Sequence, residues 1–350
     1  MRSIRIKLLC LPLLYVTGLA LTLAACSGGP AATVKQSSGP PVAQPALADY
    51  PLTVENCGQE LTFDQPPQRI VTLEQTLTEI SLALGVEDRM VGTSYVTDPI
   101  LPELKAAYDS VPVLAELYPT QEVVLETEPD FIYAYGPTSV SAENAGTPES
   151  YANLGIPVYV LPVSCLDDSL SVPTIAFDGF FDEIRTLASI YGVPEAGQEL
   201  IAEQRERIDA ALGKHQPPPD GTSFVWWFAG TDTPYFGTET SDAGNYASLL
   251  GMENAFADGG PGRWAGTSWE VIADRDPDVI VLADLTRGND GDSAKSKIEY
   301  LKSNPATAQL TAVVEDQFIV VPGSARGYSI RTVESLERIV DGLREIYGER

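Results

Sequence analysis

A phrase that occurs twice constrains this chain more than any other feature. Residues 122–134 read EVVLETEPDFIYA, and residues 270–283 read EVIADRDPDVIVLA, offset by 148 positions. Each copy predicts a short helix that ends before Pro-Asp and is followed by a buried strand, because proline disfavours helix in the preceding residue and the next run is apolar and β-branched. Two such units indicate two lobes of similar build.

Strands and helices alternate around both copies. This alternation favours an α/β fold with largely parallel sheets. The expected strands are residues 69–73, 90–94, 157–161, 223–228 and 317–321, and the expected helices are residues 78–84, 245–250 and 332–347, with Gly85 and Gly251 closing the first two helices.

Two further helices are expected between the halves, at residues 177–191 and 194–212. We interpret the second as a rigid helix that crosses from one lobe to the other; an ordinary surface helix within one lobe fits the same pattern. The expected divisions are a leader at 1–25, a tether at 26–48, a first lobe at 49–175, a helical segment at 176–215 and a second lobe at 216–350.

The N-terminus predicts export. Arg2, Arg5 and Lys7 precede the apolar stretch 8–25, which has the order of a secretory signal. The stretch ends in Leu-Ala-Ala-Cys, similar to the lipobox of lipoproteins, so we expect Cys26 to carry a lipid. The alternative is a permanent transmembrane helix, which needs about 20 apolar residues. The Gly-, Pro- and Ser-rich residues that follow favour a flexible tether.

Charge and cysteine usage agree with export. Without the leader, 19 basic residues face 49 acidic ones, a formal net charge of −30, which disfavours binding to nucleic acid or anionic lipid. Only Cys57 and Cys165 remain after the leader and anchor, and an oxidising compartment would let them form a disulfide. Two separate buried thiols are the alternative.

The order of these features resembles the substrate-binding proteins of ABC importers for iron-siderophores, haem and vitamin B12. The resemblance covers about residues 50–350 and is carried by residues 67–85, the two repeats and Thr267–Glu270. It implies two α/β lobes joined by one long helix, a ligand cleft between the lobes, an ABC permease as partner and a monomer without a cofactor. The expected ligand is a ferric siderophore, with haem or cobalamin as alternatives, and the expected location is the outer face of the cell membrane, reached through the lipid anchor.

The resemblance also implies site residues. Glu122 and Glu270 match the glutamates that dock onto the permease, although both could simply stabilise helix N-termini. Aromatic and arginine side chains in the loops suit a bulky anionic chelate, while packing of loop against lobe is the alternative for each aromatic. The expected ligand-binding residues are Glu74, Tyr95, Tyr118, Tyr135, Tyr235, Trp264, Arg326, Tyr328 and Arg331.

Two other function classes find little support. Direct metal capture is disfavoured because His215 is the single histidine and no cysteine pair has metal-ligand spacing, so no metal site is expected. A hydrolase is disfavoured because the nucleophile-elbow, metalloprotease and phosphate-loop motifs are missing from the sequence, so no catalytic residues are expected. The long connecting helix predicts small lobe motions around a largely preformed cleft.

Overall fold

The computed structural model describes residues 50–165, 176–260, 262–288 and 291–348, all within one compact unit, residues 45–350. The expected leader, the expected lipidation site Cys26 and the expected tether lie outside the described residues. Over the described ranges, no helix is both long enough and apolar enough to cross a membrane.

The first lobe is built on a five-stranded parallel sheet in the order β5-β4-β3-β6-β7. Its strands are β3 (Ile70–Leu73), β4 (Met90–Ser94), β5 (Val113–Ala115), β6 (Phe131–Ala134) and β7 (Val158–Val160). Its helices are α1 (Gln75–Ala83), α2 (Lys105–Tyr108), α3 (Gln121–Glu126) and α4 (Pro148–Ala152), with 3-10 turns η1 (Glu87–Arg89), η2 (Pro102–Leu104) and η3 (Pro162–Ser164).

An antiparallel hairpin of β1 (Leu52–Asn56) and β2 (Gln59–Phe63) is fixed to the β7 edge of this sheet. The Asn56 side chain accepts from Val160 N at 2.8 Å and donates to Val160 O at 2.7 Å. Cys57 and Cys165 form the expected disulfide, with their Cα atoms 5.2 Å apart. The hairpin therefore belongs to the first lobe.

The second lobe is built on a six-stranded mixed sheet in the order β11-β9-β8-β12-β13, with β10 also pairing with β8. Strands β8, β10, β12 and β13 are parallel, whereas β9 and β11 add an antiparallel edge that the sequence pattern did not predict. The strands are β8 (Ser223–Ala229), β9 (Tyr235–Gly237), β10 (Glu253–Asn254), β11 (Trp264–Gly266), β12 (Val279–Asp284) and β13 (Phe318–Pro322). The helices are α7 (Asp242–Leu250), α8 (Trp269–Arg275), α9 (Ala294–Ser303), α10 (Thr311–Val314) and α11 (Arg331–Tyr347).

The repeated phrase is confirmed as an equivalent unit in each lobe: α3 leads into β6, and α8 leads into β12. The aspartate of each Pro-Asp pair serves the same purpose. Asp130 accepts hydrogen bonds at 2.8 Å from the backbone N–H groups of Gln68 and Arg69, just before β3. Asp278 accepts from Ser223 N at 2.8 Å at the start of β8. Each aspartate thus satisfies orphan donors at the entrance to the first strand of its sheet.

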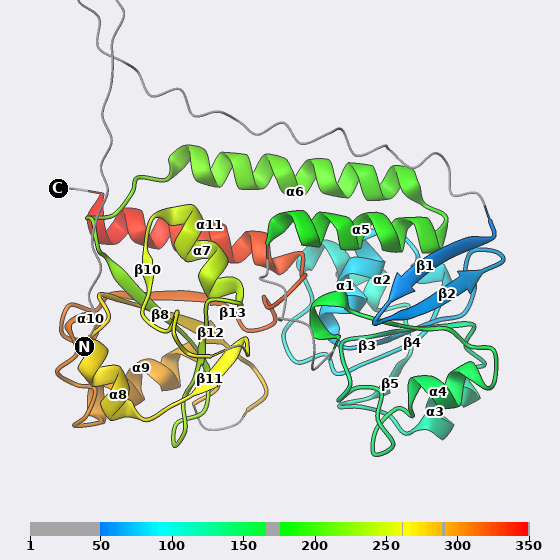
Figure 1. Ribbon diagram of the computed structural model, residues 1–350, viewed down its shortest axis with the longest axis horizontal. Helices are drawn as coiled ribbons and strands as arrows, with labels where there is room; N and C mark the ends of the chain where they lie inside the picture. The colour runs from blue at the N-terminus through cyan, green and yellow to red at the C-terminus, as the bar shows by residue number, and fades with distance from the viewer. Residues whose placement is uncertain (1–49, 166–175, 261, 289–290, 349–350) are drawn as a thin grey trace, which may run out of the picture. The chain divides into compact units, whose positions relative to one another are not determined.

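Helices α5 (Phe177–Tyr191) and α6 (Pro194–Lys214) connect the lobes, and α6 lies along both α5 and α11 (Figure 1). A Cβ at Gly197 would overlap Ala188, so close packing of α6 on α5 requires glycine there. On the other lobe, Arg207 of α6 pairs with Glu337 of α11 at 2.8 Å. The prediction of a long interdomain helix is confirmed.

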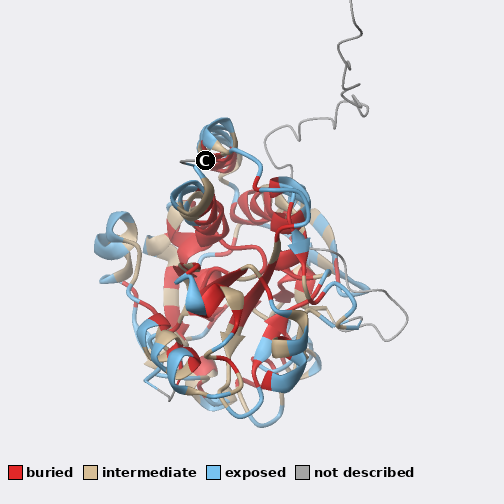
Figure 2. Cartoon of the chain, turned by 90° about the vertical axis from the view of Figure 1, so that its left-hand side faces the viewer, coloured by how far each residue is buried: buried red, intermediate tan, exposed pale blue. Residues whose placement is uncertain are grey.

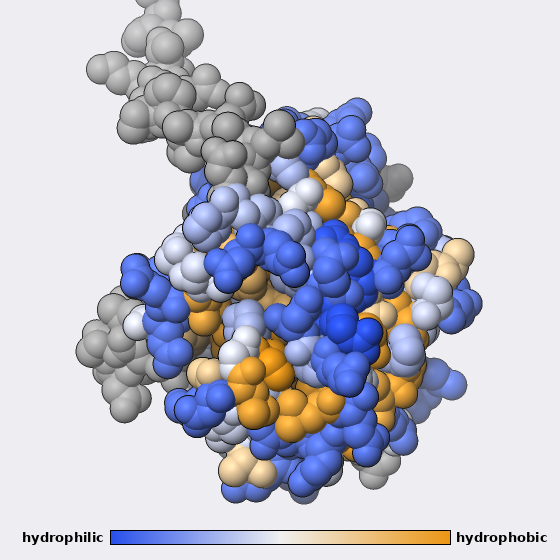
Figure 3. All heavy atoms as spheres, turned by 90° about the vertical axis from the view of Figure 1, so that its right-hand side faces the viewer, coloured by the Kyte–Doolittle hydropathy of each residue, from blue (hydrophilic) through white to orange (hydrophobic). Residues whose placement is uncertain are grey.

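One apolar cluster runs through both lobes. It includes Ile70 of the first sheet, Leu187 of α5, Ile208 of α6 and Leu336 of α11. Figure 2 shows the buried residues concentrated on strands and on the inward faces of helices. Seen from the first-lobe side, the surface is mostly hydrophilic, with apolar side chains gathered in its lower part (Figure 3). Because the core is continuous, the connection between the lobes is stiff.

Candidate functional site

The candidate site is formed where strands of the two sheets end. Glu74 directly follows β3, Tyr95 follows β4, and Tyr135 follows β6, so three neighbouring parallel strands deliver side chains to one edge. From the second lobe, Phe228 comes from the end of β8 and Arg326 from the loop after β13. The carboxyl ends of parallel strands are the usual place for ligand sites in α/β folds.

Arg326 lies at the centre of this site. Its guanidinium forms an ion pair with the Glu74 carboxylate across the two lobes. Its Cζ atom lies 4.8 Å from the centre of the Tyr135 ring and 5.4 Å from that of the Phe228 ring. Burial raises the pKa of Glu74, and the Arg326 guanidinium opposes that shift. A cation is therefore held between two aromatic faces and one buried carboxyl group.

Two aromatic pairs flank the arginine. The Tyr95 and Tyr118 rings stack with their centres 4.5 Å apart, and the Phe228 and Trp264 rings lie 4.7 Å apart. Burial and the Glu74 carboxylate raise the pKa of Tyr118, and burial raises the pKa of Tyr135. These phenols are therefore neutral at physiological pH and offer flat surfaces with a polar edge.

The cavity beside Arg326 is small. The cavity at this site has a volume of about 60 Å³ and is lined by residues of both lobes, including Glu74, Tyr95, Phe228 and Arg326. Ligand pockets in proteins usually measure about 300–1,000 Å³. A second hollow of about 450 Å³ is also lined by residues of both lobes, among them Asp98, Thr286 and Arg331. A largely preformed cleft therefore stays a prediction.

A set of polar contacts closes the lobes beside the cavity. Asp98 of the first lobe accepts a hydrogen bond from Ser324 N at 2.7 Å and lies 3.1 Å from the Thr286 hydroxyl. Glu79 of α1 binds Arg331 through both carboxylate oxygens. These contacts join the loop after β4 and helix α1 to the loops after β12 and β13 and to the start of α11.

The structure brings together six of the nine predicted ligand-binding residues: Glu74, Tyr95, Tyr118, Tyr135, Trp264 and Arg326. The other three lie elsewhere. Arg331 is committed to Glu79, the Tyr328 hydroxyl packs against Gly179 of α5, and Tyr235 is 46% exposed on strand β9.

The predicted set of residues did not include Phe228 and Asp242, which belong to the site, or Arg287, which lines the cavity. Phe228 occupies a strand position that reads as core, and only its place at the end of β8 signals a cleft residue. Asp242, in the first turn of α7, is buried and accepts a hydrogen bond from Gly327 N at 3.0 Å. Burial raises the pKa of Asp242 to about 7. A buried acid next to the Arg326 loop adds a second carboxyl group to the site.

The two docking candidates occupy equivalent positions. Glu122 is the second residue of α3 and Glu270 the second residue of α8, and both side chains are exposed. The backbone amide of Glu122 and the Thr120 side chain lower the pKa of Glu122; the Ser268 side chain and the backbone amide of Glu270 lower the pKa of Glu270. Both helices lie on the lower side of their lobes, opposite α6 (Figure 1).

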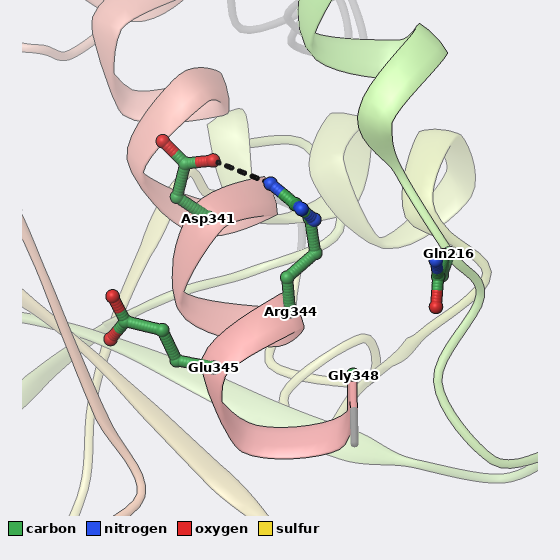
Figure 4. A pocket seen from close by; sticks show the side chains of 5 residues that line it. All are labelled: Gln216, Asp341, Arg344, Glu345 and Gly348. Atoms are coloured by element: carbon green, nitrogen blue, oxygen red, sulfur yellow. Dashed lines mark ion pairs between the residues drawn. The ribbon is translucent and has the colours of Figure 1, made fainter. Parts of the chain in front are cut away.

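A larger hollow of about 650 Å³ lies at the end of α11 (Figure 4). It is lined by Gln216, Asp341, Arg344, Glu345 and Gly348. Asp341 and Arg344 pair at 3.6 Å along the helix. No predicted site residue that the structure describes lines this hollow. Within the described ranges, no group of three or more His, Cys, Asp or Glu residues could hold a metal ion.

The family model described as periplasmic binding protein matches residues 70–325. Among curated proteins, the vitamin B12-binding protein of Pectobacterium carotovorum is 26% identical over 220 residues, covering 62% of this chain and 71% of the relative. The vitamin B12-binding protein of Vibrio campbellii is 25% identical over 230 residues, covering 65% of this chain and 74% of the relative.

Two solved structures have a similar fold. A periplasmic binding protein from Veillonella parvula has a TM-score of 0.72 and 28% identity, covering 85% of this chain and 98% of that one. An ABC-type Fe3+-hydroxamate transport system structure from Saccharomonospora viridis has a TM-score of 0.69 and 25% identity, covering 84% of this chain and 99% of that one. Both likenesses extend over nearly the whole of the compared chains.

Proposed function

The chain belongs to the periplasmic binding protein family, and from that premise we propose that it captures an anionic ferric chelate of the siderophore class between its lobes. It is a binding protein of the ABC importer type, and this family consists of substrate-binding components that act on the periplasmic or extracellular side of the membrane. The observation that carries the proposal is the Arg326 guanidinium placed between the rings of Tyr135 and Phe228 at the junction of the lobes.

This arrangement matches the chemistry of the proposed ligand. A ferric chelate is bulky and has a flat or rounded organic shell, which suits the aromatic surfaces of Tyr95, Tyr118 and Trp264. Its iron-bound oxygens carry negative charge, which suits a guanidinium with several N–H donors. The iron is cargo here and would arrive already chelated.

Ligand binding beside Arg326 requires the lobes to separate or the side chains there to move, since the cavity at that place, about 60 Å³, is too small for a chelate. Helix α6 packs along both lobes and limits this separation to a small hinge motion. For delivery, we propose that Glu122 and Glu270 bind basic side chains of the permease, one on each lobe. Two carboxylates at equivalent helix starts would fix both orientation and register.

We also propose that the protein acts as a monomer tethered to the membrane through a lipid on Cys26. The support for the tether is the N-terminal sequence: a basic start, an apolar stretch and the Leu-Ala-Ala-Cys motif. Metabolic labelling with a fatty acid would test it, with Cys26→Ser as the variant that should lose the label.

Cobalamin is a second candidate ligand. The relatives from Pectobacterium carotovorum and Vibrio campbellii are both named vitamin B12-binding proteins. Stacked aromatic side chains would also suit a large corrin ring. Against this, a large and nearly neutral ligand makes little use of an arginine at the centre of the cleft.

Fluorescence titration of the purified protein tests the proposal, because Trp264 lies in the site. The panel comprises ferric catecholate, ferric citrate, ferric hydroxamate, haem and cobalamin. Saturable quenching by an anionic ferric chelate at submicromolar concentration is expected. A response confined to haem or cobalamin would keep the transport role and replace the ligand class.

A further inference from the structure

The two arginine–glutamate pairs that cross between the lobes differ in how well they are satisfied. Arg331 binds Glu79 through Nε and Nη2 and also donates to Pro99 O at 2.6 Å. Arg326 donates to Glu74 through Nη2 alone, and the second carboxylate oxygen of Glu74 is buried with no hydrogen-bond partner among the described residues. In the described part of the chain, both carboxylate oxygens of Glu79 are therefore hydrogen-bonded, whereas one carboxylate oxygen of Glu74 is not.

The backbone at Glu74 is also unusual. Its φ of 140° lies in a region that residues with a side chain rarely adopt. The next strand end repeats the feature, with Tyr95 at a φ of 55°. Strained residues persist only where their surroundings hold them, and they cluster at ligand clamps and switch regions. The strain at Glu74 therefore marks a position retained for a purpose other than stability.

The cavity at the junction of the lobes leaves little free space around the ion pair. The Glu74 carboxylate and the Arg326 guanidinium both line the cavity of about 60 Å³, and the guanidinium lies between the rings of Tyr135 and Phe228. A ligand that is to contact these aromatic rings must displace the carboxylate, the arginine, or both. An incoming anion would meet the Arg326 guanidinium already paired with the Glu74 carboxylate.

We infer that Glu74 is an internal anion that holds Arg326 while the cleft is closed, and that an anionic oxygen of the ligand replaces the Glu74 carboxylate on binding. This inference rests on the proposed function and assigns Glu74 as a specificity-determining residue. A charged chelate offers Arg326 a new partner and so compensates for the lost ion pair. An uncharged ligand offers no such compensation and is disfavoured.

The test compares the wild-type protein with Glu74→Gln, using ferric tris-catecholate as an anionic chelate and ferric tris-hydroxamate as an uncharged one. The variant should bind the anionic chelate about tenfold more tightly or better. Its affinity for the uncharged chelate should change by less than about twofold. Glu79→Gln is the matched control, because it alters the other interlobe pair and should give no gain that depends on ligand charge.

An equal change for both chelates, or a loss for both, would overturn the inference and indicate that Glu74 contacts the ligand directly or is structural. Sulfate provides a test that needs no siderophore. It should raise the melting temperature of Glu74→Gln more than that of the wild type, because only the variant leaves Arg326 free for a small anion. If neither protein binds a chelate, the proposed function falls, and equal stabilisation by sulfate would then overturn the role of Glu74 as well.

Discussion

Glu79 and Arg331 join the two lobes through an ion pair in which the Arg331 Nε lies 2.7 Å from one carboxylate oxygen and Nη2 binds the other. The Glu79 side chain is fully buried, and the Arg331 side chain is 7% exposed. The pair connects α1 to the start of α11 across 252 residues of sequence. It therefore holds the two lobes together at the first turn of α11.

Removal of one partner of this pair should destabilise the protein strongly. Glu79→Ala leaves a buried guanidinium without its counter-charge, so the free energy of unfolding should fall by about 3–5 kcal/mol. Urea unfolding measures the change. Asp109→Ala removes the exposed pair with Lys105 and should cost less than about 1 kcal/mol. Equal losses of unfolding free energy in the two variants would mean that the buried pair contributes no more to stability than the exposed pair.

The effects of the proposed docking residues should be separable from those of the proposed ligand-binding residues. Glu122→Ala combined with Glu270→Ala should abolish uptake in cells that express the permease, because both charged contacts with it are lost. The ligand affinity of the double variant should be unchanged, since neither side chain lies at the cleft. Isothermal titration provides the affinity, and a weaker affinity in this variant would remove the docking assignment.

Trp264 and Tyr235 provide a matched pair of aromatic substitutions on neighbouring strands β11 and β9. Trp264→Ala should weaken ligand binding by roughly 1 to 3 kcal/mol, because its ring lies against Phe228 beside Arg326. Tyr235→Ala should leave the affinity unchanged, since its side chain is exposed and lies outside the cluster. The reverse order of effects would move the binding surface to the exposed side of β9.

Glu183 of α5 should make stability depend on pH. It is buried and accepts hydrogen bonds from the Tyr133 hydroxyl and, at 2.8 Å, from the Tyr159 hydroxyl. Burial raises the pKa of Glu183 to about 7, against the opposing effect of the two tyrosines. Between the ordinary pKa of a glutamate and pH 7, the folded protein therefore keeps a proton that the unfolded chain has lost.

The stability that this proton provides is present at low pH and is lost as the pH rises through about 7, a change of up to about 3 kcal/mol. Melting temperatures measured from about pH 5 to about pH 8 should fall less steeply for Glu183→Gln than for the wild type. Burial raises the pKa of Asp242 to about 7 as well, so some slope should remain in both proteins. An exposed control, Glu103→Gln, should behave as the wild type; a slope for Glu183→Gln equal to the wild-type slope would contradict the assignment.

Local sequence signals predicted the fold well. The Pro-Asp motifs, Gly85 and Gly251 are local features, and the elements around them agree with the prediction. Helix α1 begins at Gln75 rather than residue 78, because the chain turns directly from β3 into the helix at the strained Glu74. The β9–β11 edge was missed because its strands are short and pair antiparallel.

The site was only partly predictable. Glu74, Tyr95 and Tyr135 each follow a strand, and they lie at one edge of the first-lobe sheet as predicted, since parallel strands end together. The difference between Arg326 and Arg331, only five residues apart, depends on which first-lobe carboxylate each one meets. That information lies about 250 residues away in sequence and has no local pattern.

The most direct test of the central claim is a crystal structure of the protein with the anionic ferric chelate that binds it. We expect the chelate between the lobes, with the Arg326 guanidinium hydrogen-bonded to a chelate oxygen, the Trp264 ring against the organic shell and the Glu74 carboxylate released. A chelate bound outside the cleft, for example in the hollow beside Arg344, would rule out the proposed binding mode. So would a chelate between the lobes that makes no contact with Arg326.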